Sequence, residues 1–189
     1  DRLFTRQLVL LDSVDPALRR FLIDLPVHTY PDVKILVPMA YAIDFPGRDE
    51  LASIVRCDAL VGSAEELTTL MMTSTLDDAI ARLQAMMRIS NLRYVAITLG
   101  ADGALAFDAI QTMRVPAIEV DAVDTTGAGD AFAGALAVAL ATRLDLRDAL
   151  VLANCVSGLA CRSIGAQSSL PGIDEVEITL RRYLDRVPL

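Results

Sequence analysis

The chain has 189 residues, of which 53% are hydrophobic and 22% charged, and its formal net charge is −8. This composition is that of a folded domain, and its acidity argues against a basic surface for nucleic acid. The longest apolar run, residues 131–141, is too short to cross a bilayer, which takes about 20 residues. We therefore expect a soluble, cytoplasmic protein without a nucleic-acid or membrane partner.

The strands and helices predicted along the chain alternate. Strands are expected over 7–11, 33–37, 58–61, 93–99 and 104–107, and an extended segment over 115–123. Helices are expected over 15–25, 46–56, from 63 onward, and over 77–90, 130–142, 146–162 and 173–186. This alternation in the first hundred residues predicts parallel β-α-β units, and hence an α/β sheet with helices on both faces, in a single domain.

Rare residue types limit the chemistry that this chain can perform. The three cysteines are unevenly spaced and form no C-x-x-C pair, which favours reduced thiols over disulfides. His28, which lies between Pro26 and Pro31 in an expected loop, is the only histidine, and this argues against a histidine-based zinc site or a Ser-His-Asp triad. Lys34 is the only lysine and no G-x-x-x-x-G-K-[ST] occurs, so a lysine-dependent P-loop is excluded as well.

A turn of small residues, Asp124 to Gly129, separates the extended segment from an Ala-rich helix expected to begin near Asp130. A helix N-terminus presents unpaired N–H donors and about half a positive charge. Gly127, Ala128 and Gly129 can therefore offer backbone amides to an anion without a lysine. Asp130, beside that site, can accept a proton from a hydroxyl that attacks a phosphoryl group. The alternative is that Asp130 only caps the helix.

Residues 124–137 spell DTTGAGDAFAGALA. They resemble, at every constrained position, the second signature of the PfkB (ribokinase-like) carbohydrate kinases, D-T-x-G-A-G-D followed by three residues and then small, small, apolar, apolar. The resemblance implies a three-layer α/β sandwich with a mostly parallel sheet, and ATP- and Mg²⁺-dependent phosphorylation of a sugar hydroxyl. It makes Asp130 the general base and assigns the anion hole to the amides of Gly127, Ala128 and Gly129.

Two further segments support the resemblance to this family. Residues 98–103, TLGADG, resemble the T-L-G-x-x-G loop that lines the nucleotide, where glycines let the backbone approach a ligand closely. The assigned residues are Thr98, Leu99, Gly100, Ala101, Asp102 and Gly103. Asn154 lies where the family contacts the nucleobase region. Taken alone, the loop would be an ordinary hairpin turn and Asn154 a polar helix residue.

Residues 165–171, GAQSSLP, resemble the G-A-x-x-S-x-P ending typical of ribokinases. In ribokinases this loop and the signature hold a monovalent cation such as K⁺, and a hard cation takes oxygen donors. The resemblance places six residues around that cation: Asp124, Thr126, Ala160, Ser163, Gly165 and Ser169. The alternative is a plain loop.

Two positions depart from the family pattern. Where relatives have N-x-x-E, residues 63–66 are SAEE, so the pair that helps to organise Mg²⁺ and phosphate keeps only its glutamate. We still assign Glu66 to Mg²⁺ and Ser63 to the nucleotide, with a Ser-x-x-Glu capping box as the structural alternative. Val37 and Pro38 stand where many relatives have Asp-Pro.

The resemblance covers nearly the whole chain but only the C-terminal portion of the family. We expect residues 1–189 to be the C-terminal part of one ribokinase-like domain, with the N-terminal strands, the lid and most of the sugar pocket in a longer protein or on a partner chain. The substrate therefore stays open among ribose, fructose-type sugars, ketogluconate and nucleosides, and a homodimer stays open too.

Two other functions are compatible with parts of this pattern. A nucleotide-binding module without catalysis would bind ATP and release no phosphorylated product. A Rossmann dinucleotide domain is a weaker alternative, because Phe132 stands where the third glycine of G-x-G-x-x-G is required.

Overall fold

The computed structural model describes residues 8–10, 15, 17, 21, 34–39, 51 and 55–186. The chain divides into two compact units. Unit 1 comprises Asp1–Ile97 with Leu105–Met113, and unit 2 comprises Thr98–Ala104 with Arg114–Leu189.

Unit 1 is built on parallel strands. Strands β1 (Leu8–Leu10), β2 (Lys34–Pro38) and β3 (Ala59–Ser63) are neighbours in this order, with Leu8 opposite Lys34 and Leu36 opposite Ala59. The strands predicted over 7–11, 33–37 and 58–61 are thereby confirmed. The helices predicted over 15–25 and 46–56 lie mostly outside the described residues, although residues 17, 21 and 51 are helical. His28 also lies outside the described residues.

The sheet continues with β4 (Tyr94–Thr98), β5 (Ala104–Phe107) and β6 (Thr112–Val115), in the order β1 to β6 among the described residues. Parallel neighbours need a crossover of about a dozen residues or more. The four- or five-residue connections around β5 are too short for that, so β5 runs antiparallel to its neighbours β4 and β6 and the sheet is mixed. Of the extended segment expected over 115–123, only Val115 belongs to a strand.

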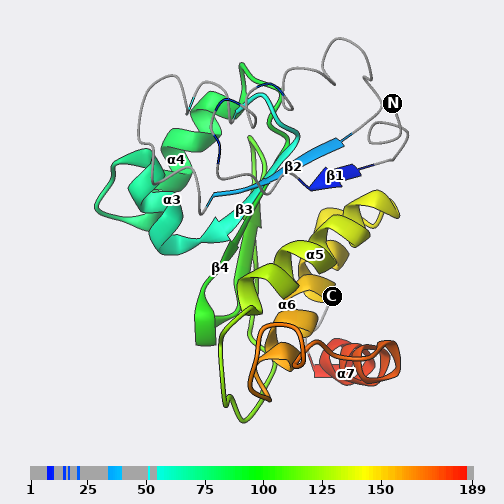
Figure 1. The fold of residues 1–189 in the computed structure, drawn as a ribbon. Helices are drawn as coiled ribbons and strands as arrows, with labels where there is room; N and C mark the ends of the chain where they lie inside the picture. Colours follow the sequence, from blue (N-terminus) through cyan, green and yellow to red (C-terminus); the bar gives the residue numbers. More distant parts are fainter. Residues whose placement is uncertain are drawn as a thin grey trace. The chain divides into compact units, whose positions relative to one another are not determined.

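Two helices follow β3 in unit 1, α3 (Ala64–Met71) and α4 (Leu76–Met87) (Figure 1). The side chain of Thr75 caps α4 by accepting the amide of Asp78. Ile80, Leu83 and Met87 are buried on one side of α4, as the amphipathic pattern predicts. The helix ends at Met87 rather than at the expected Ser90.

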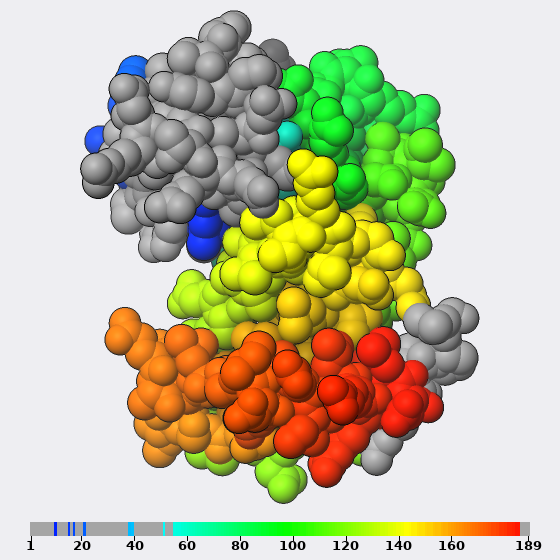
Figure 2. All heavy atoms as spheres, turned by 90° about the vertical axis from the view of Figure 1, so that its right-hand side faces the viewer, coloured from blue at the N-terminus to red at the C-terminus, as the bar shows by residue number. Residues whose placement is uncertain are grey.

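Unit 2 is dominated by three helices, α5 (Ala128–Ala141), α6 (Leu146–Ala160) and α7 (Ile173–Arg186). Helices α5 and α6 lie side by side, and α7 packs against α6 (Figure 1). Buried alanines on α5, among them Ala133, Ala137 and Ala139, leave room for this close approach. Residues 161–172 and α7 form a band beside the surface of α5 and α6, orange and red in Figure 2.

In the part of the chain that the structure describes, no helix combines the length and apolar character that a membrane span needs.

Candidate nucleotide and phosphate site

The signature turn leads directly into α5. The helix begins at Ala128, two residues before the expected start at Asp130, and Gly127 is its N-cap. Gly127 is left-handed, with φ 80° and ψ 0°. A Cβ on Gly127 would lie 2.8 Å from Cα and Cβ of Ala166. Both the backbone conformation and the contact with Ala166 therefore require glycine at this position.

One of the three amides assigned to the anion hole is already engaged within the fold. The Ala128 amide donates to the carbonyl of Thr125 at 3.1 Å, so the expectation of a free donor at Ala128 is wrong. The cause is the reverse turn over residues 125–128 that precedes the helix, because it engages an amide that the helix start alone would leave open. Among the described residues the amides of Gly127, Gly129 and Asp130 have no hydrogen-bond partner. These three donors stand at the positive end of the α5 dipole.

Asp130 is the third residue of α5 and its side chain is exposed. The capping alternative is wrong, because Gly127 is the N-cap and no side chain makes a capping bond there. Among the described residues no hydrogen bond or ion pair engages the Asp130 carboxylate. Among the described residues, apart from the backbone of its own helix, no heavy atom lies within 4 Å of where a Cβ on Gly129 would be. A carboxylate and open backbone amides thus occupy adjacent positions with space in front of the glycine.

Asp124 fastens the turn to the loop that follows α6. Its Oδ1 accepts the amide and the hydroxyl of Thr126 at 2.9 and 2.7 Å, and its Oδ2 accepts the amide of Gly165 at 3.0 Å. These bonds, the hydroxyl of Thr126 first, lower the pKa of the Asp124 carboxyl below its ordinary value. One carboxylate therefore joins segments 41 residues apart.

The residues assigned to a monovalent cation are only partly brought together. Asp124, Thr126 and Gly165 are linked by the bonds just described, and the carbonyl of Gly165 accepts the amide of Ser169 at 3.2 Å. Ser169 is buried and its hydroxyl has no hydrogen-bond partner among the described residues. A buried hydroxyl oxygen without such a partner is compatible with a cation ligand. Ala160 is buried and Ser163 exposed, and no hydrogen bond joins them to that group in the described ranges.

The loop assigned to the nucleotide is a hairpin connection. Residues Gly100–Asp102 form one 3-10 turn, and the amide of Leu99 donates to the carbonyl of Gly103 at 2.8 Å. The fold itself explains Gly103, because a Cβ there would lie 2.1 Å from the carbonyl oxygen of Val115. Gly100, with φ 61°, has open space around it. Of the two glycines, Gly100 is the one that leaves room for a ligand.

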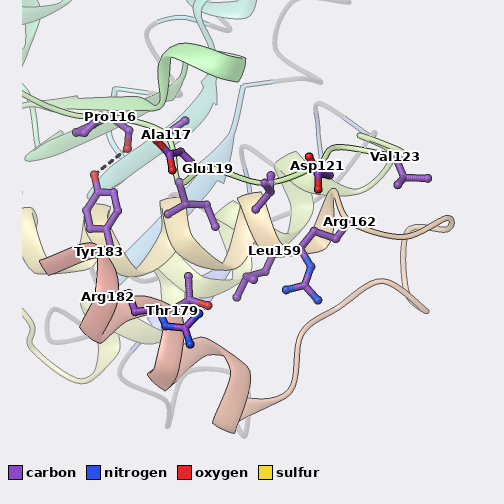
Figure 3. Close-up of a pocket in the computed structure, with 12 residues that line it drawn as sticks. Pro116, Ala117, Glu119, Asp121, Val123, Leu159, Arg162, Thr179, Arg182 and Tyr183 are labelled. Atoms are coloured by element: carbon purple, nitrogen blue, oxygen red, sulfur yellow. Dashed lines mark hydrogen bonds between the residues drawn. The ribbon is translucent and has the colours of Figure 1, made fainter. Parts of the chain in front are cut away.

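Asn154 is buried on α6, and its Nδ2 donates to the carbonyl of Pro116 at 2.7 Å. The hydroxyl of Tyr183 on α7 donates to the same oxygen at 2.7 Å, as Figure 3 shows. Burial raises the pKa of Tyr183 to about 12, so its hydroxyl remains a donor at any ordinary pH. Asn154 therefore holds the backbone that leads into the signature. Sequence analysis missed Tyr183, since no motif contains it.

Ser63 and Glu66 lie in unit 1 and form the capping box of α3. The Ser63 hydroxyl accepts the Glu66 amide at 3.1 Å, and Oε2 of Glu66 accepts the Ser63 amide at 2.8 Å. The structural alternative for this pair is confirmed. No group of three or more His, Cys, Asp or Glu side chains suited to a metal occurs within the described ranges.

A groove of about 750 Å³ lies between residues 116–123, α6 and α7 (Figure 3). None of the predicted site residues lines it. Several of its polar groups are used within the fold: Arg162 forms an ion pair with Glu175, and Tyr183 is bound to Pro116. The groove is therefore separate from the signature turn, none of whose residues from Asp124 to Asp130 lines it.

The chain is similar to known proteins in both sequence and fold. The family model described as pfkB family carbohydrate kinase matches residues 33–173. A ribokinase of Lactococcus lactis is 40% identical over 85 residues, which cover 45% of this chain and 28% of that protein. The ribokinase of Thermotoga maritima superposes with a TM-score of 0.79 at 25% identity, over 95% of this chain and 58% of that one. A ribokinase II of E. coli, in complex with ATP and Mg²⁺, gives a TM-score of 0.68 at 28% identity, over 79% and 49% of the two chains.

The fold is that of the ribokinase-like α/β kinases, as the resemblance implied. The match to the family model covers well over half of the residues, and the chain belongs to the PfkB family of carbohydrate kinases. It spans only 28% of the Lactococcus relative and 58% of the Thermotoga one.

Proposed function

We propose that the protein transfers the γ-phosphoryl group of ATP to a hydroxyl group of a sugar. The observation that supports this most directly is the unpartnered carboxylate of Asp130, one residue beyond the open amide of Gly129. Membership of a carbohydrate kinase family and the similarity to a structure holding ATP and Mg²⁺ support the choice of reaction and nucleotide.

In this reaction Asp130 accepts the proton of the sugar hydroxyl. The sugar oxygen then forms a bond to the γ-phosphorus, while the bond from that phosphorus to the bridging oxygen breaks and ADP leaves. The amides of Gly127, Gly129 and Asp130, together with the α5 dipole, stabilise the negative charge on the phosphoryl oxygens. This local positive end allows a chain with a net charge of −8 to bind a polyanion without a lysine.

The remaining assignments concern the nucleotide and the cations. The loop Thr98–Gly103, with open space at Gly100, is assigned to the nucleotide, and Asn154 supports the Pro116 backbone. Bound Mg²⁺ would neutralise phosphate oxygens, and Glu66 is its proposed ligand through the carboxylate oxygen that the capping box does not use, which accepts no hydrogen bond among the described residues. A monovalent cation would be held by carbonyl and hydroxyl oxygens, Ser169 Oγ among them.

The test is ADP release by the full-length protein with ribose, fructose, ketogluconate and nucleosides. Asp130→Asn should lower kcat by about 100-fold or more while ATP still binds, because general-base catalysis contributes on the order of 10²–10⁴. Asp121→Asn removes another exposed carboxylate of unit 2 and is the control. Unchanged turnover of Asp130→Asn would remove that residue from its role. ATP binding in calorimetry with no product from any sugar would favour a non-catalytic nucleotide-binding protein.

Self-association is a separate part of the proposal. A homodimer remains a prediction from the family resemblance, and light scattering of the full-length protein decides it.

A further inference from the structure

Residues 116–124, the segment that leads into the signature, are held by α6 and its C-cap residue. Asn154 and Ser157 lie on one face of α6, three residues apart, and the C-cap residue Cys161 follows four residues later. Asn154 binds the carbonyl of Pro116, where the segment begins. The carbonyl of Cys161 accepts the amides of Val123 and Asp124 at 2.8 and 3.1 Å, where the segment ends.

Ser157, on the same face as Asn154, reaches the phosphate-binding turn itself. Its Oγ donates to the carbonyl of Ala128 at 2.9 Å, across 29 residues of sequence. A serine inside a helix commonly bonds back to a carbonyl one turn earlier in its own helix. Here the hydroxyl instead leaves its helix and binds the first residue of α5.

Ala128 is thereby fixed from both directions. Its amide donates to Thr125 at 3.1 Å, and its carbonyl accepts Ser157. Gly127 and Gly129, on either side of it, have the widest conformational freedom of any residue type. Among the described residues, its own helix backbone aside, no heavy atom lies within 4 Å of a Cβ at Gly129. The two bonds of Ala128 therefore help to fix the orientation of the turn between these glycines.

We infer that Ser157 is a positioning residue for phosphoryl transfer, an inference that rests on the proposed function. Its hydroxyl holds Ala128, and through Ala128 it keeps the free amides of Gly129 and Asp130 and the Asp130 carboxylate in a constant geometry. In this role it acts through Ala128 and needs no contact with nucleotide or sugar. The signature motif does not include this half-buried serine of α6.

The experiment compares three variants of the full-length protein. Ser157→Ala removes the donor, Ser157→Thr restores a hydroxyl, and Val156→Ala trims the neighbouring half-buried side chain of α6 as a packing control. Steady-state kinetics with ATP, calorimetry with Mg·ADP and thermal melting are measured for each. We expect Ser157→Ala to lower kcat/KM for ATP by about 5- to 10-fold, as for one lost hydrogen bond, and Ser157→Thr to recover most of it. Val156→Ala should lower the melting temperature comparably and leave kcat/KM near that of the wild type.

Two results would overturn the inference: wild-type kcat/KM in Ser157→Ala, or an equal loss in Val156→Ala. If the wild type releases no ADP with any sugar, the proposed reaction is refuted instead. Mg·ADP affinity then decides the role of Ser157, since weaker binding by Ser157→Ala supports it and equal binding overturns it.

Discussion

A substitution at Gly129 should change ligand binding and protein stability in opposite directions. Gly129 is helical and exposed, and a Cβ at this position would have no heavy atom within 4 Å, so nothing inside the described fold requires glycine there. Replacing a helical glycine by alanine removes unfolded-state freedom and stabilises a protein by about 0.5–1 kcal/mol. Gly129→Ala should therefore raise the free energy of unfolding by that amount.

The same substitution should impair ATP binding. The added methyl group would occupy the open space in front of the Gly129 amide, where the proposal places the phosphates. We expect the affinity for Mg·ATP to fall at least about 10-fold, or about 1.4 kcal/mol. A stabilising substitution that weakens binding is a result that loss of folding cannot produce.

Two other glycines calibrate the measurement. Gly134→Ala, in the same helix and likewise without neighbours, should stabilise by about 0.8–1 kcal/mol and leave ATP affinity unchanged. Gly127→Ala should destabilise by about 2–5 kcal/mol, from a left-handed backbone and the 2.8 Å approach to Ala166. Urea unfolding and calorimetry of the full-length variants give both quantities. If Gly129→Ala binds ATP as tightly as Gly134→Ala does, the phosphates do not lie at this amide.

Three further changes test neighbouring parts of the structure. Ser63→Ala should cost about 1 kcal/mol of unfolding free energy through loss of the capping box, whereas Ser63→Asn keeps a cap and should leave stability unchanged in urea titrations. If the family's asparagine matters for Mg²⁺, Ser63→Asn should also lower the Mg²⁺ concentration needed for half-maximal activity. Asn154→Ala and Tyr183→Phe each remove one donor from the Pro116 carbonyl. In a double-mutant cycle the double variant should lose more unfolding free energy than the two single variants together, because it alone leaves that carbonyl without a side-chain donor. Strict additivity would contradict a shared acceptor. The lowered pKa of Asp124 means that its contribution to stability is present above the ordinary carboxyl pKa of about 3.9 and is lost as the pH falls through its folded value. Acid unfolding curves of the wild type and Asp124→Asn should therefore converge at low pH, and parallel curves would exclude this linkage.

Local sequence patterns predicted the elements whose signals are local. The apolar runs indicated the strands near residues 8, 34, 59 and 94, and Ser63 with Glu66 predicted the start of α3. The start of α5 was misplaced by two residues, because glycine and alanine at 127–129 suit both a turn and a helix. The close approach of Ala166, which is distant in sequence, leaves no room for a side chain at Gly127, and local sequence patterns do not indicate this contact.

The signature identified the candidate phosphate site, but its supporting contacts could not be predicted. The bond between Ser157 and Ala128 and the bond between Tyr183 and Pro116 join residues 29 and 67 positions apart. A single sequence contains no signal for such pairs, since serine and tyrosine in helices are common in any fold. The prediction that Ala128 is an open donor failed because the turn before the helix closes with a bond from the Ala128 amide to Thr125, which the signature does not indicate.

Residues 116–124 are secured in different ways at their two ends. At Pro116 both side-chain donors are insensitive to acidity, since an amide does not titrate and the Tyr183 hydroxyl, with a pKa of about 12, stays protonated. At Asp124 the attachment to Gly165 depends on a charged oxygen. Acidification should therefore weaken the attachment to Gly165 first, while the bonds to Pro116 and the backbone bonds of Val123 and Asp124 to Cys161 do not depend on a titrating group.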